Sequence, residues 1–162
     1  MSDALHDRLA ALEARMQTLE DELAVTRTIV AYGFAVDSGD APATGALFTE
    51  DAVFDVDGGF VMQGRAEVEA MVLDEHGHQR LLPDCAHTIG PAVVRVDGDA
   101  ATAVGYSRIS LKRDDAFGHF RLGCNRWDLR RTGSGWQISG RLTRVLGSAE
   151  AQQVLAQGIP LR

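Results

Sequence analysis

The order in which helical and extended patterns follow one another is the feature that most constrains the fold of this chain. Four long extended runs span residues 86–96, 100–113, 117–132 and 136–146. Short segments rich in Asp, Gly and Ser separate them, and each suits a hairpin connection. Because the helical patterns precede these runs instead of alternating with them, the chain is expected to form an α+β fold with an antiparallel meander.

The first half of the chain favours helices and one short hairpin. The expected elements are a helix ending at 37, a helix over 41–48, strands over 52–56 and 60–63, and a helix over 66–73. A sheet that bends around such helices makes a cone. We therefore predict a cone-shaped α+β barrel, with the N-terminal helices packed in a strongly bent, mostly antiparallel sheet. Residues 148–162 are expected to form a short helix and an irregular end.

A stripe of apolar residues marks the first helix. Its members are Leu5, Leu9, Leu12, Met16, Leu19 and Leu23. Their 4-3-4-3-4 spacing places all six on one helical seam. One interpretation is a short coiled coil that joins subunits, and the other is an amphipathic helix that folds against its own domain. We expect the first, with a helical extension over 1–25, a domain over 26–147, a tail over 148–162 and a homo-oligomer, either a dimer or a trimer.

Composition limits the partners. The chain has 162 residues and a formal net charge of −7, from 16 Lys and Arg against 23 Asp and Glu. Binding to nucleic acid or to an anionic membrane needs a concentrated basic face, so neither partner is expected. The two cysteines, Cys85 and Cys124, lack a Cys-x-x-Cys spacing and are expected to be reduced and buried. Without a signal sequence or a membrane span, we expect a cytoplasmic protein.

Polar residues in apolar surroundings are the candidates for a site inside the cone. They are Tyr32, Asp37, His87 and Arg141, with Arg144 as an alternative to Arg141. An aspartate that accepts a hydrogen bond from a histidine fixes its tautomer and leaves the other ring nitrogen to take a proton. Each residue also has a structural interpretation: Tyr32 as an ordinary core residue, Asp37 as a turn residue, His87 as a satisfied strand residue, and Arg141 as part of an exposed charge pair.

Other side chains are predicted to line the cavity or to be unrelated to chemistry. The predicted substrate-binding residues are Phe34, Phe54, Tyr106, Ser110 and Trp127. His76 and His78 lack the i, i+4 spacing of helical zinc sites, so we interpret them as part of a solvated lid loop and expect no metal. No phosphate-binding loop and no Gly-x-Ser-x-Gly motif occur, so no cofactor and no nucleophilic serine are expected.

Several segments together resemble the SnoaL-like branch of the nuclear transport factor 2-like superfamily. They are residues 28–37, 47–54, 64–68, 85–88 and 131–141, within a resemblance that covers about 22–146. The spacing is most similar to scytalone dehydratase, hexachlorocyclohexane dehydrochlorinase and bile acid 7α-dehydratase. Those enzymes pair an Asp at the end of the first core helix with a His at the start of the following long strand.

The resemblance implies roles for four residues. Asp37 and His87 match the paired Asp and His. The bile acid enzyme also has a Tyr five residues before that Asp, which Tyr32 matches, and an Arg in the last strand, which Arg141 fits best, with Arg144 as the alternative. The second histidine of scytalone dehydratase is absent at 105–110, which argues against scytalone as the substrate.

The function implied by the resemblance is a cofactor-independent lyase that acts on a cyclic or aromatic molecule by dehydratase-like elimination. The alternatives are a non-catalytic domain that binds a small ligand or supports assembly, and an isomerase similar to ketosteroid isomerase.

Overall fold

The computed structural model describes residues 2–159 and contains four helices, a short 3₁₀ turn and six strands in that part of the chain. The helices are α1 (Ser2–Asp37), α2 (Ala41–Ala46), α3 (Arg65–Leu73) and α4 (Ala149–Ala156), and the 3₁₀ turn spans Gln79–Leu81. The strands are β1 (Phe48–Val56), β2 (Phe60–Gln63), β3 (Cys85–Asp97), β4 (Ala100–Arg113), β5 (Ala116–Thr132) and β6 (Gly135–Val145).

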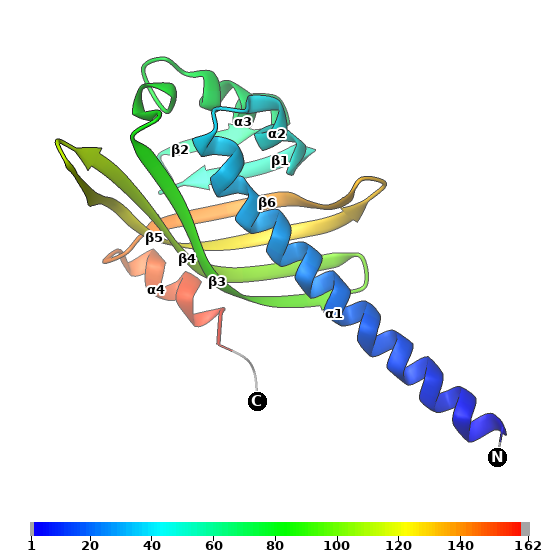
Figure 1. Ribbon diagram of the computed structural model, residues 1–162. Coiled ribbons are helices and arrows are strands. Elements are labelled where there is room, and N and C mark those ends of the chain that lie inside the picture. Colours follow the sequence, from blue (N-terminus) through cyan, green and yellow to red (C-terminus); the bar gives the residue numbers. More distant parts are fainter. Residues whose placement is uncertain (1, 160–162) are drawn as a thin grey trace.

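The six strands form one sheet in the order β2-β1-β6-β5-β4-β3. All neighbouring pairs are antiparallel except β1 and β6, which run parallel. Register shifts interrupt four of the five pairings, and one of these shifts lies at Gly90 and Pro91 of β3. Such irregularities bend and twist a sheet. The sheet curves around the second half of α1 (Figure 1), which confirms the predicted fold class.

The main core lies between the concave face of the sheet and the second half of α1. Val25, Ile29 and Val36 are buried there against aromatic and aliphatic side chains of β1, β5 and β6. The first half of α1 extends away from the domain as a bare helix (Figure 1). Its six stripe residues are 49–68% exposed. Packing of the stripe against its own domain, the alternative interpretation, is therefore wrong.

Helix α4 covers the opposite, outer face of the sheet. Ala151 and Val154 of this helix pack on Val104 and Cys124 in a second, smaller core. Ser148 caps the helix by accepting a hydrogen bond from the N–H of Ala151. The expected C-terminal helix is thus present, and the last three residues of the predicted irregular end lie outside the described part.

Most predicted boundaries lie within one residue of the observed ones. The exceptions are near β1, which begins at Phe48 and not at Ala52, so that the preceding helix ends at Ala46. The reason is the parallel pairing of Phe48 with Ile138, a long-range partner that local patterns do not reveal. Cys85 and Cys124 are both free and buried, as predicted. Within residues 2–159, no helix is long and apolar enough to cross a membrane.

Candidate active site

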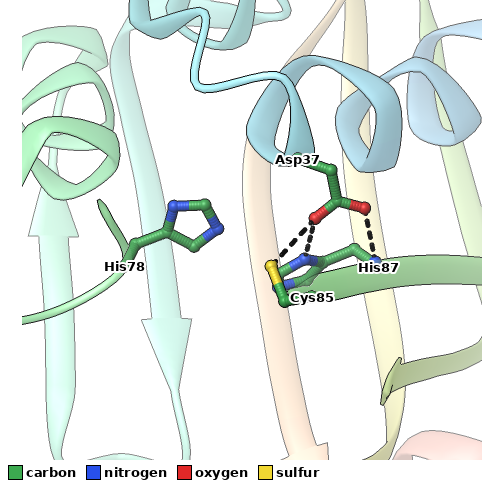
Figure 2. A group of neighbouring side chains, drawn as sticks. All are labelled: Asp37, His78, Cys85 and His87. Atoms are coloured by element: carbon green, nitrogen blue, oxygen red, sulfur yellow. Dashed lines mark hydrogen bonds and ion pairs between the residues drawn. The ribbon is translucent and has the colours of Figure 1, made fainter. Parts of the chain in front are cut away.

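Asp37 and His87 form a close pair where the end of α1 meets the start of β3. Asp37 is the last residue of α1, and His87 lies near the start of β3. One carboxylate oxygen of Asp37 lies 2.6 Å from Nδ1 of His87, and the other accepts a hydrogen bond from the backbone N–H of His87, also at 2.6 Å. Both carboxylate oxygens of Asp37 therefore bind His87, one through its ring and one through its backbone (Figure 2). These two contacts fix the imidazole in position and orientation.

Gly33 allows α1 and β3 to approach this closely. A Cβ atom at this position would lie 2.4 Å from the backbone oxygen of His87. No real Cβ contact is so short, so any other residue would push the strand away from the helix. Sequence analysis did not single out Gly33, although a glycine inside a helical pattern is a signal for close packing.

The hydrogen bonds of the pair determine the charge of Asp37. Burial raises the pKa of this carboxyl, but the hydrogen bonds from the ring and the backbone of His87 outweigh burial and hold the pKa below its usual value. Asp37 is therefore ionised at neutral pH. An ionised carboxylate accepts the Nδ1 proton, so Nε2 of His87 is left with its lone pair.

His87 forms part of the wall of a largely apolar cavity of about 210 Å³. The lining residues are Tyr32, Phe54, Val56, Phe60, Met62, Met71, His87, Ile89, Ser107, Ile109, Arg121, Arg141 and Thr143. A larger groove lies on the outer face between β3, β4 and α4, but its walls contain no acid or histidine. The inner cavity is therefore the candidate active site.

The structure brings Tyr32 and Arg141 together in this cavity. The guanidinium carbon of Arg141 lies 4.1 Å from the ring centroid of Tyr32 and 4.5 Å from that of Phe54. Burial raises the pKa of Tyr32, so its hydroxyl is protonated. Arg144 points to the other face of β6, where it pairs with Asp55 and Glu150. Of the two arginines, Arg141 is thus the one that faces the cavity.

Four of the five predicted binding residues lie elsewhere, and Phe54 alone lines the cavity. Phe34 is 76% exposed on the far side of α1, and Trp127 is buried in the core behind Arg141. Tyr106 and Ser110 face outward from β4, because Ser107 and Ile109 occupy its inner face. For β4, the prediction was wrong by one residue, and a shift of one residue exchanges the two faces of a strand.

His78 also corrects a prediction. It is only 8% exposed, and its ring centroid lies 5.4 Å from that of His87, so the loop that carries it is not simply solvated. Neither of its ring nitrogens has a hydrogen-bond partner in the described part of the chain. Burial, followed by the neighbouring His87, lowers the pKa of His78, which favours the neutral imidazole.

A metal ion has a set of possible ligands here. Atoms of Asp37, His78, Cys85 and His87 lie within 4.8 Å of one another (Figure 2). Imidazole, thiolate and carboxylate are the ligands that Zn²⁺ prefers. Burial and the nearby Asp37 raise the pKa of Cys85 to about 12, so without a metal it is a neutral thiol whose Sγ lies 3.5 Å from Asp37.

Sequence analysis missed four polar residues of the cavity region. Ser107, Arg121 and Thr143 line the cavity, and the fully buried Asn125 accepts hydrogen bonds from Arg141. Arg121 and Asn125 carry a signal that the analysis overlooked, since both are polar residues on the inward-facing positions of β5.

Comparison with known proteins identifies the family of this fold. A SnoaL-like domain matches residues 17–142. An NTF2-like protein with a cystatin-like fold from Novosphingobium aromaticivorans is 40% identical, with a TM-score of 0.87, and the match covers 91% of this chain and 96% of that one. A point variant of Rv3472 from Mycobacterium tuberculosis, a protein of unknown function, is 22% identical, with 88% of each chain covered and a TM-score of 0.72.

A second Novosphingobium aromaticivorans protein, provisionally described as an aromatic ring hydroxylase, is 27% identical. That match covers 80% of this chain and 92% of the other, with a TM-score of 0.64. No curated protein matches the sequence. The domain match and the 40% identical structure together show that this chain belongs to the SnoaL-like family, with an NTF2-like fold.

Proposed function

We propose that this protein is a cofactor-independent lyase that eliminates a leaving group from a cyclic or aromatic small molecule. The observation that carries the proposal is the 2.6 Å contact between Asp37 and Nδ1 of His87, on the wall of an apolar cavity. This is the arrangement of a histidine general base with a carboxylate that orients it. The proposal includes the dehydratase-like subgroup of the family and a cytoplasmic location.

In the proposed reaction, His87 removes a proton from carbon. Nε2 takes a C–H proton that a neighbouring carbonyl group acidifies, and the resulting imidazolium is stabilised by Asp37. The electron pair of the C–H bond forms the new C=C bond, and the bond to the leaving group breaks. For a hydroxyl leaving group, the imidazolium or the phenol of Tyr32 supplies the proton that releases it as water.

Arg141 and Tyr32 stabilise charge as it develops. The guanidinium faces the cavity from β6, and a cation that is fixed before reaction lowers the energy of an enolate without reorganisation. The apolar walls exclude water and strengthen this effect. Positioning in a dry cavity therefore supplies the part of the rate enhancement that proton transfer does not.

The test is an assay on ring compounds that carry a hydroxyl group β to a carbonyl, with the conjugated product followed by its ultraviolet absorbance. His87→Gln should lower turnover by about 10²–10⁴-fold, the usual contribution of general acid–base catalysis. Asp37→Asn should cause a similar loss, because it removes the ionised acceptor. His119→Gln, at an exposed histidine of β5, is the matched control and should keep full activity.

The assay also separates the two rival functions. Tight ligand binding without turnover by any variant would favour a binding domain. Exchange of a ring proton with solvent, with movement of a double bond and no loss of a group, would favour an isomerase. Full activity of His87→Gln would contradict the proposed base.

Metal-assisted catalysis is a second candidate, because the unpartnered ring of His78 faces the other three possible ligands. The four atoms need only a small closure to reach tetrahedral Zn²⁺ at about 2.0–2.3 Å each. His78→Gln and Cys85→Ser should then abolish both Zn²⁺ binding and activity, and a chelator should inhibit. Under the acid–base proposal, activity survives the chelator, and both variants retain most of it.

A further inference from the structure

Arg141 is the most unusual charged group in the cavity. Its side chain lies on β6 among aromatic rings, and the residue is only 6% exposed. Nε and Nη2 donate to the amide oxygen of Asn125 at 3.2 and 3.1 Å. The amide nitrogen of Asn125 donates in turn to Ser107 at 2.8 Å, which fixes the orientation of the amide. The guanidinium is therefore held in one position.

This guanidinium has no counter-ion in the described part of the chain. No carboxylate oxygen of residues 2–159 lies within 4.0 Å of it, although the other buried arginine of β6, Arg144, pairs with two. Burial lowers the pKa of Arg141, and the neighbouring Tyr32 hydroxyl, which is itself protonated and carries no charge, offsets this only in part. Nη1 is buried and has no hydrogen-bond partner. A buried charge without a counter-ion is unfavourable, so an anion that bound at Nη1 would be stabilised there.

Arg121 adds a second unused donor to the same cavity. This residue lies on β5, and its Nη1 binds Asp57, which neutralises its charge. Its Nη2 is buried and has no partner. None of the residues that line the cavity is Asp or Glu, and Arg141 is the lining arginine whose charge no acid of the described residues neutralises. The walls otherwise consist mainly of aromatic and aliphatic side chains.

We propose that the cavity takes its substrate as a carboxylate, held at Nη1 of Arg141 with help from Nη2 of Arg121. This inference rests on the proposed function for its assumption that the cavity is the substrate site, and it adds the class of the substrate. A cavity of about 210 Å³ is smaller than the usual range for drug-sized ligands, about 300–1,000 Å³. The substrate class is thus an acid with a single aromatic or alicyclic ring.

The carboxylate serves as an anchor and not as the activating group. An ionised carboxylate acidifies its neighbouring C–H bond less than a ketone does, so the proton that His87 removes lies next to another group. Anchoring acts on the resting molecule before any proton moves, so when a carboxylate occupies Arg141 the stabilisation of the enolate falls to Tyr32. Binding measurements without turnover therefore test it.

The experiment is calorimetric titration of the unmodified protein with phenylacetate and with its neutral analogue phenylacetamide, in chloride-free buffer. Phenylacetate should bind at least about tenfold more tightly, as expected for a hydrogen bond to a charged group. Equal affinities would overturn the inference. So would failure of phenylacetate, benzoate and cyclohexanecarboxylate all to bind.

Three arginine variants locate the subsite. Arg141→Met should remove the preference for the carboxylate, and Arg121→Met should reduce it less, because Asp57 already neutralises Arg121. Arg126→Met, on the outer face of β5, is the matched control and should keep the full preference. A preference that persists in a folded Arg141→Met variant would overturn the assignment. The comparison of the two ligands on the unmodified protein stands even if this variant does not fold.

His87→Gln separates this inference from the proposed function. The variant should retain the preference for phenylacetate, since His87 does not contribute to the arginine subsite. Absence of lyase activity in the unmodified protein would contradict the proposed function and leave the anion subsite standing. Loss of the carboxylate preference in His87→Gln would place the anion on the histidine and overturn the subsite.

Discussion

The two halves of α1 have similar apolar patterns and opposite surroundings. Residues 3–20 and Leu23 are exposed, which includes all the large apolar side chains of the stripe, whereas Val25, Ile29 and Val36 are almost fully buried. The change occurs at Asp21, which binds Arg131 of β5 and the indole N–H of Trp136 in β6. The comparison teaches that helical periodicity identifies an apolar face and does not reveal what covers it.

The two halves of α1 have different structural roles. The inner half carries Tyr32 into the cavity and brings Asp37 to His87, so its packing also holds the proposed catalytic pair. The outer half presents a heptad stripe, and a parallel or antiparallel copy of the same stripe fits its spacing. We propose that a second or third copy of this chain covers it, which gives a homo-oligomer through a short coiled coil.

The largest expected effect is on the packing of the inner half. Ile29→Ala removes a side chain that is 1% exposed and should lower the free energy of unfolding by about 2–5 kcal/mol. Urea denaturation measures this change. The matched variant is Leu5→Ala, at a residue 68% exposed near the start of α1. If Leu5→Ala destabilised the domain as much as Ile29→Ala does, the two halves would not differ in the way described.

The second effect concerns the approach of α1 to β3. Gly33→Ala forces the backbone of His87 away from the helix and should lower turnover by about 10²-fold, the usual result of a misplacement near 1 Å. In a helix without this clash, Gly→Ala stabilises by up to about 1 kcal/mol. A Gly33→Ala variant with full activity and higher stability would show that the close contact does not position His87.

The third effect tests the junction at Asp21 through its pH dependence. The hydrogen bond from Arg131 is the main cause that lowers the pKa of Asp21 to about 2, from an ordinary value of 3.8. A lowered folded-state pKa stabilises the protein above about pH 4, and this stabilisation is lost as the pH falls from 4 toward 2.

Asp21→Asn should therefore cost about 1 kcal/mol at pH 7, because solvent screens much of the ion pair. Urea denaturation at several pH values should show the cost shrinking toward pH 2. A cost that is the same at pH 7 and pH 2 would contradict the assigned charge.

The smallest effect on the stability of the domain comes from the outer half. Replacing Leu12 with Glu puts a charge into the proposed coiled-coil seam and should lower the oligomeric mass measured by light scattering. The domain itself should change by less than about 0.5 kcal/mol, because the side chain makes no core contact. Glu13→Gln, at the next position, is the control. A mass that Leu12→Glu leaves unchanged would place the subunit contact elsewhere.

Local sequence patterns predicted the boundaries of the long strands well, but predicted poorly which residues of a strand face the inside of the sheet. The four long strands were located to within one residue, because turns rich in Asp, Gly and Ser separate them. The inner and outer faces of β4 were exchanged at Tyr106 and Ser110. The physical reason is that β4 is covered on both sides, by the main core and by α4, so apolar residues occur on both faces and the alternation disappears.

The residues of the candidate site likewise divide into those that the sequence revealed and those that it did not. Asp37 and His87 were found because each is a polar residue at the end of an apolar segment. His78 was misinterpreted, since it lies in a loop without periodicity and only the closure of that loop buries it. Arg121 and Asn125 were missed because charged or amide residues on a strand are usually solvated.

The sequence by itself determined the α+β class, the order of the elements, the length of α1 and the candidate pair of Asp37 and His87. These follow from periodicity, turn residues and family motifs, which act over a few neighbouring residues. Only the tertiary structure decided that Arg141 and not Arg144 faces the cavity, that β1 pairs with β6, and that His78 is buried. Those outcomes depend on contacts between residues far apart in the chain, where one residue of register reverses the direction of a side chain.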